Sequence, residues 1–220
     1  MKVVRKLTAG LVLALPLAAQ TLVVDRPLAD GPGLAQAVER GAKGAYADAF
    51  RIGAAGQVWM IQTVRVWAIP SSAPSCPREL GDQVEKITLY GALDNPPVPG
   101  VPVCDCHALV ALATAALQPG SGASTNPGVI VTPEKGMYRL DFRDVRWSVP
   151  GDSETLFTVR VTSRRPQSCN AAAGWALAAA RAKPEYRLHL LNDKGVPVGL
   201  EPARREPRMV HVQVWAERTK

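Results

Sequence analysis

Apolar and polar side chains alternate with a period of two along most of this chain, which is the pattern of strands that bury one face. The longest such run covers residues 58–69 and is rich in β-branched and aromatic residues. Within it, Trp59 and Ile61 share one face. To keep Val64, Val66 and Ala68 on that face, the alternation must shift by one position within residues 62–64. A β-bulge produces such a shift by inserting one residue. We therefore predict a long central strand with a bulge within residues 62–64.

Shorter alternating runs, separated by segments rich in proline, glycine and asparagine, indicate further strands. They cover residues 50–52, 84–91, 129–131, 138–143, 157–161, 175–180, 186–191 and 208–216. Residues 104–118 are rich in alanine and leucine but have no clear period, so a short helix and an edge strand both stay open. The chain shows neither strand–helix alternation nor an internal repeat. We therefore predict an all-β fold, an antiparallel β-sandwich over residues 46–218, preceded by a lead-in arm at residues 20–45.

The first 19 residues have the three parts of a secretory signal peptide. Lys2, Arg5 and Lys6 form a basic start, residues 11–17 an apolar segment, and Leu17-Ala18-Ala19 a small-residue cleavage site. The apolar segment is shorter than the about 20 residues that cross a bilayer. We therefore expect a protein that is secreted or periplasmic, with no membrane span in the mature chain.

The number and placement of charged residues indicate which classes of partner the protein binds. Three of the 26 basic residues and none of the 19 acidic residues lie in the predicted signal, so its removal lowers the net charge from +7 to +4. The remaining basic residues are scattered, apart from pairs at residues 164–165 and 204–205. A nucleic-acid surface needs a dense basic stripe with interleaved aromatic residues. We do not expect nucleic acid as a partner.

Four cysteines follow the signal, and an even number in an exported protein indicates disulfides. A bond between Cys104 and Cys106 would close a strained ring, so Cys76 is expected to pair with one of them and Cys169 with the other. The alternative is a zinc site made by Cys104, Cys106, His107 and Cys169. The C-x-C-H spacing departs from that of structural zinc sites, so we expect disulfides and neither metal nor cofactor.

No catalytic arrangement is visible. His189 and His211 alternate with apolar neighbours inside predicted strands, as histidines on a sheet surface do, and no G-x-S-x-G motif occurs. Asp141 shares its predicted face with Arg139 and Arg143, which is typical of a solvated sheet face. We therefore expect a protein that is not an enzyme.

Aromatic residues offer the best candidate ligand contacts. Trp67 points away from Val66 and Trp215 away from Val214, so both lie opposite the predicted core, as does Tyr90. Exposed on one sheet face, two tryptophans would form a broad apolar platform for a sugar ring. In the alternative reading, loops or the arm cover this face.

The order of the framework residues resembles one known group. The strand at residues 50–52, Trp59-x-Ile61-x-x-Val64, the strand at residues 87–91 and the turn at residues 96–100 are similar to the jelly-roll β-sandwich modules of secreted bacterial proteins. The resemblance covers residues 46–216 and rests on core and turn positions. It implies a jelly-roll-like fold and carries over no ligand site, because these modules are mostly uncharacterised. The four cysteines and residues 104–118 depart from the pattern.

These observations predict a non-catalytic binding or adhesion module, with carbohydrate as the leading ligand and Trp67, Tyr90 and Trp215 as its contacts. The alternative is a structural exported protein that binds another envelope protein through a sheet edge. A hydrolase is the third and weakest reading.

Overall fold

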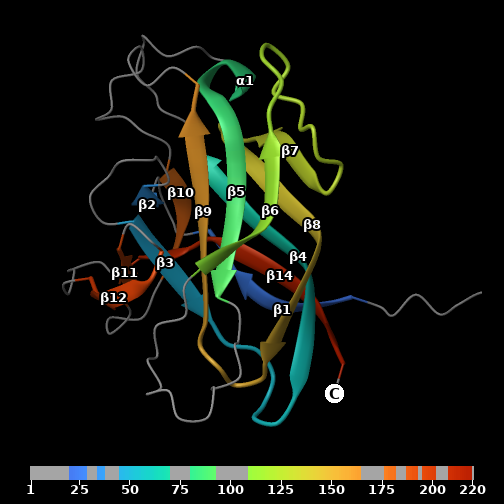
Figure 1. Ribbon diagram of the computed structural model, residues 1–220, viewed down its shortest axis with the longest axis vertical. Coiled ribbons are helices and arrows are strands. Elements are labelled where there is room, and N and C mark those ends of the chain that lie inside the picture. The colour runs from blue at the N-terminus through green and yellow to red at the C-terminus, as the bar shows by residue number, and fades with distance from the viewer. Residues whose placement is uncertain are drawn as a thin grey trace, which may run out of the picture.

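Two antiparallel β-sheets pack face to face in the computed structural model of the protein, which confirms the predicted all-β sandwich (Figure 1). The structure describes residues 20–28, 34–37, 45–69, 80–92, 109–164, 176–181, 187–192, 195–201 and 208–219. The predicted signal at residues 1–19 and all four cysteines lie outside these ranges.

The larger sheet has eight strands in the described part of the chain, and its centre is the predicted long strand β4. Its members are β1 (Thr21–Arg26), β2 (Leu34–Ala37), β4 (Val58–Ile69), β7 (Val129–Glu134), β8 (Met137–Pro150), β10 (Ala176–Arg181), β13 (Arg208–Val210) and β14 (Val212–Arg218). Strand β4 lies between β14 and β8, with β1 outside β14 and β7 outside β8. The strand order across this part of the sheet is therefore β1-β14-β4-β8-β7.

The second sheet has six strands in the order β12-β11-β3-β9-β5-β6. Its members are β3 (Ala45–Phe50), β5 (Val84–Ala92), β6 (Leu109–Ala116), β9 (Thr155–Ser163), β11 (His189–Leu191) and β12 (Pro197–Leu200). The four-residue helix α1 (Leu80–Gln83) precedes β5. Among the described residues, no helix is long and apolar enough to cross a membrane.

The core fills the space between the sheets with the apolar side chains that alternate along each strand. Phe50 of β3 lies at its centre, with ring centroids 5.8 Å from Trp147 of β8 and 5.6 Å from Phe157 of β9. The indole nitrogen of Trp147 donates a hydrogen bond to the carbonyl oxygen of Ala92, so its buried polar atom is satisfied.

The predicted bulge in β4 is confirmed. Opposite β14, Ile61 pairs with Ala216 and Thr63 with Trp215, which leaves Gln62 as an extra residue. The insertion turns Ile61 toward the same core as Val64, Val66 and Ala68.

The structure describes strands in two segments that the sequence analysis left open or assigned to an arm. The open choice at residues 104–118 resolves to a strand where the chain is described, because β6 forms one edge of the six-stranded sheet. The residues expected to form a lead-in arm contain strand β1, which pairs with β14 along its whole length. The larger sheet therefore includes residues that the alternation pattern did not assign to it.

A buried ion pair links the two sheets. The side chain of Asp48 in β3 is fully buried and accepts hydrogen bonds from the Arg26 guanidinium (3.0 Å), its neighbour Ala49 N (2.6 Å) and Val210 N (2.5 Å). Arg26 belongs to β1 and also donates to the carbonyl oxygen of Ala49. This carboxylate therefore joins the six-stranded sheet to two strands of the other sheet.

Candidate binding surface on the eight-stranded sheet

The outward face of the larger sheet carries regular rows of polar side chains, because residues paired across neighbouring strands point to the same side. Gln213 of β14 pairs with Arg65 of β4, and Arg65 pairs with Asp141 of β8. Asp25 of β1 pairs with Gln213 at the other end of the row. Since Val64, Val66 and their neighbours face the core, this row faces outward.

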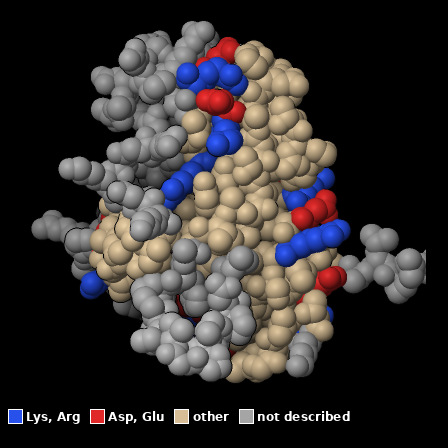
Figure 2. Space-filling model, viewed as in Figure 1, with Lys and Arg blue, Asp and Glu red and all other residues tan. Residues whose placement is uncertain are grey.

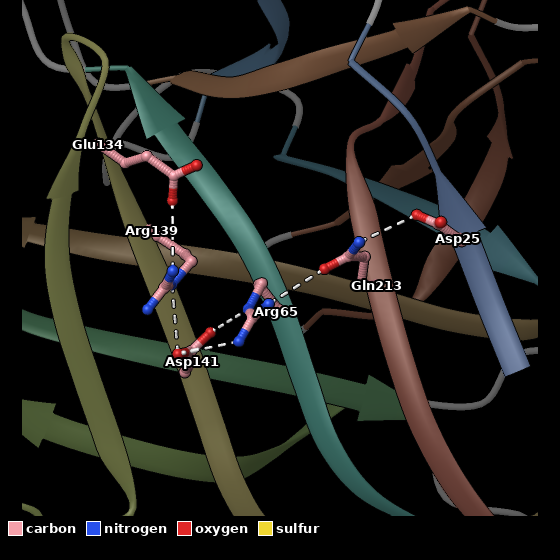
Figure 3. Close-up of polar contacts among 6 residues, drawn as sticks. All are labelled: Asp25, Arg65, Glu134, Arg139, Asp141 and Gln213. Carbon is pink, nitrogen blue, oxygen red and sulfur yellow. Dashed lines mark hydrogen bonds and ion pairs between the residues drawn. The ribbon is translucent and has the colours of Figure 1, made fainter. Parts of the chain in front are cut away.

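A continuous chain of polar contacts runs along this row (Figure 3). Gln213 donates to Asp25 (3.1 Å) and accepts from Arg65 (3.2 Å). The other nitrogens of Arg65 donate to both oxygens of Asp141, at 2.5 and 3.4 Å. We call these four residues, together with Arg139 and Glu134, the polar row.

Arg139 extends the polar row toward β7. Its Nε lies 3.4 Å from Asp141 Oδ2, and its Nη1 donates to Glu134 at 3.4 Å. From Arg65 to Glu134, basic and acidic groups therefore alternate, and each has an opposite charge beside it. At the other end of the row, Asp25 is bonded to the neutral Gln213. Such a fixed arrangement presents hydrogen-bond donors and acceptors in a defined order.

Asp141 lies on the outward face, as predicted, but it is not solvated. Its side chain is fully buried, whereas those of Arg65 and Arg139 retain 25% and 28% exposure. The two guanidinium groups cover the carboxylate and supply the charge that compensates it. The alternation identified the face of Asp141 but not this cover, which depends on which strands lie beside β8.

Trp215 is the partly exposed aromatic residue of this face. The guanidinium carbon of Arg65 lies 4.8 Å from the centre of its indole ring, a cation–π contact. Leu22 pairs with Trp215 from β1 and is 41% exposed, so the two make an apolar spot beside the polar row. We call Trp215, Leu22 and the polar row the candidate surface.

Trp67 lies on the same face as Trp215, but it is only 6% exposed, so the expected pair of exposed tryptophans does not form. Its ring stacks on the imidazole of His211, with centroids 3.8 Å apart and planes 17° apart. The alternative reading, in which this face is covered, is correct at Trp67. Alternation gives the side of the sheet to which a side chain points, but not what packs over it.

His211 is part of that cover. Its Nδ1 donates a hydrogen bond to the carbonyl oxygen of Arg26 at 2.5 Å. Burial lowers the pKa of His211 below its usual value of 6.5, and the Arg26 carbonyl, Asp25 and Glu134 oppose this shift. The ring next to Trp67 is therefore held in its neutral form near pH 7.

Tyr90, the third predicted contact, lies on the outward face of the other sheet. It is partly buried beside a small apolar cluster that includes Ala49 and Leu156, and the Arg160 guanidinium carbon lies 5.2 Å from its ring centre. Figure 2 looks onto this sheet: much of the middle of the face is uncharged, and charged side chains gather near its upper end and right margin. The structure therefore does not bring Tyr90 together with Trp215.

The chemistry of the described residues gives no indication of a metal site, since they contain no group of three histidine, cysteine, aspartate or glutamate side chains that could hold an ion. His107 and the four cysteines lie outside the described residues, so the predicted disulfides stay predictions. Sequence reasoning missed Arg65, Gln213, Asp25 and Glu134. Arg65 alternates in phase with Trp67, and Gln213 with Trp215, whereas Asp25 joins them only through the pairing of β1 with β14. Strand pairing was therefore the missing information.

The comparisons with known proteins add no assignment. No protein-family model, no curated protein and no solved structure matches this chain.

Proposed function

We propose that this protein is a secreted or periplasmic, non-catalytic binding module that recognises carbohydrate through the candidate surface. The observation that carries the proposal is the partly exposed indole of Trp215 next to a row of fixed donors and acceptors. An aromatic ring receives the apolar face of a sugar, and paired polar side chains bind its hydroxyl groups. The resemblance to secreted sandwich modules agrees with this reading.

The three predicted contacts take different roles in the proposal. Trp215 and Leu22 provide the stacking spot, and Gln213 and Arg65 provide neighbouring hydrogen bonds. Trp67 is buried and stacks on His211, so it supports the candidate surface and does not touch the ligand. Tyr90 belongs to the opposite face and is not a contact.

The test is binding of the oxidised chain, residues 20–220, to a glycan array. We expect selective binding that Trp215→Ala reduces by at least about tenfold, the equivalent of 1.4 kcal/mol. Tyr90→Ala is the matched control, because it removes a partly exposed aromatic residue and its cation–π contact from the other sheet. Unchanged binding by Trp215→Ala, or equal losses in both variants, would refute the assignment of the surface.

A second candidate is a structural exported protein that binds another protein through a sheet edge. Strand β12, at one end of the six-stranded sheet, exposes Val198 (63%) and Leu200 (52%). At the other end, the edge of β6 is partly occupied, since the carbonyl oxygens of Thr114 and Ala116 accept hydrogen bonds from Asn126 and Thr125. A stable oligomer without glycan, lost in Val198→Asp, would favour this candidate.

A further inference from the structure

Strand β8 contains a second and larger irregularity beside the candidate surface. Opposite β4, Ile61 pairs with Trp147 and Thr63 with Arg143. The three residues 144–146 of β8 therefore lie opposite the single residue Gln62. We call residues 144–146 the β8 bulge.

The backbone of the β8 bulge is strained. Asp144 and Arg146 have φ angles of 53° and 52°, in the left-handed region that favours glycine. Among the described residues, the other non-glycine positions of this kind are Lys135 and Asp152, and both lie in the turns that flank β8. A tight turn requires such angles, whereas the middle of a strand does not. Strained backbone positions cluster at functional sites, and β-bulges are over-represented beside such sites.

The β8 bulge borders the candidate surface. Arg143, immediately before it, lies in one row with Thr63 and Trp215, with neighbours in the row about 5 Å apart. Opposite the bulge, Gln62 donates a hydrogen bond to Glu217, two residues beyond Trp215. A ligand on Trp215 therefore reaches this segment across a single strand.

The charges of this segment are not compensated as those of the polar row are. Arg143, Asp144 and Arg146 are exposed, and their side chains make no hydrogen bond or ion pair with any described residue. Arg65 and Arg139, by contrast, each bind a carboxylate. The bulge and Arg143 together carry a net charge of +1, and none of the three charged groups is paired with another described residue.

We propose that the β8 bulge and Arg143 bind the carboxylate of an acidic sugar, and that the carbohydrate recognised next to Trp215 is therefore an acidic polysaccharide. This inference rests on the proposed function and names its ligand class. A guanidinium group binds a carboxylate through two parallel hydrogen bonds, which a neutral sugar cannot form. Arg146 and Arg143 provide these donors, and Asp144 accepts hydrogen bonds from neighbouring hydroxyl groups.

The experiment compares oligogalacturonate with its methyl ester, which keeps the sugar and removes the charge. We expect the protein to bind the acid at least about tenfold more tightly than the ester. Arg146→Gly should lose this preference. It should also leave the melting temperature unchanged or raise it by about 2 to 4 °C, because glycine relieves the strain.

Lys135→Gly is the matched control. It removes the same charge at a nearly identical φ of 50°, but in the turn between β7 and β8. We expect it to change stability in the same direction and to leave binding of the acid unaltered. Effects of net charge or of backbone strain alone would appear in both variants.

The outcomes separate the two proposals. If a neutral glycan binds and Trp215→Ala abolishes that binding while the acid gains nothing, only the role of the β8 bulge is refuted. The role of the β8 bulge is also refuted if Arg146→Gly and Lys135→Gly bind the acid equally well. If the wild-type protein binds no glycan of either kind, both proposals fail.

Discussion

Asp48 and Asp141 have the same chemistry and the same burial, yet they occupy different kinds of places in this sandwich. Both carboxylates are fully buried, and both are paired with arginine. Asp48 lies between the sheets, and two of its hydrogen-bond donors are backbone N–H groups. Asp141 lies on the outer face of one sheet, and its partners are the partly exposed side chains of Arg65 and Arg139.

The difference lies in what happens to the partners when the carboxylate is removed. The N–H group of Val210 cannot leave its place without moving strand β13, and the Arg26 side chain is only 13% exposed. The guanidinium groups over Asp141 can rotate toward water. Two equally buried carboxylates therefore need not make equal contributions to stability.

The largest effect is expected for Asp48→Ala. It leaves the Arg26 guanidinium without its counter-ion and the N–H group of Val210 without its acceptor, so we expect the free energy of unfolding to fall by about 3 to 5 kcal/mol. Urea unfolding at pH 7, followed by circular dichroism, measures the change. A loss below about 1 kcal/mol would mean that the pair linking the sheets behaves like a surface ion pair.

A smaller effect is expected for Asp141→Ala. Its two arginines can regain hydration, so the loss should be about 1 to 2 kcal/mol, the scale of buried hydrogen bonds. The same variant should alter the fluorescence of Trp215, because Arg65 is no longer held over the ring by Asp141. The comparison between the aspartates fails if this variant is as unstable as Asp48→Ala.

The smallest effect concerns His211, whose hydrogen bond to the Arg26 carbonyl connects it to the strand that carries the partner of Asp48. Its pKa is lower in the folded than in the unfolded protein, because burial disfavours the charged ring. The neutral ring therefore contributes its full stability above pH 6.5, and this contribution is lost as the pH falls through the folded-state pKa.

His211→Gln tests this contribution, because the glutamine side chain does not titrate. Melting temperatures measured between pH 7.5 and pH 5 should fall less steeply in this variant than in the wild-type protein. Parallel curves would show that His211 does not contribute to the pH dependence of stability.

The alternation of side chains predicted the architecture well, because burial of one strand face is a local signal. It located β4, its bulge at Gln62 and the faces of Trp67, Trp215 and Asp141. It could not predict that Trp67 is buried against His211, since that contact joins strands far apart in sequence. Strand β1 was missed because Thr21–Arg26 does not alternate, since three apolar residues follow one another at residues 22–24, and its pairing with β14 is visible only in the folded chain.

The β8 bulge shows a different limit. A left-handed backbone is usually signalled by glycine, but residues 144–146 are Asp, Val and Arg. The sequence therefore gives no local sign of the segment to which we assign ligand recognition. Sites of this kind depart from the local rules that make the rest of a fold predictable.

The pairing of β1 with β14 also sets an order of events during synthesis. Strand β1 is made early, but its partner, Val212–Arg218, is made almost 200 residues later, and β4 needs that same strand on one of its sides. Until β14 has emerged, two strands of the larger sheet keep unpaired edges, which are the features that attract other chains. A nascent chain that stalls before Val212 therefore exposes both edges at once.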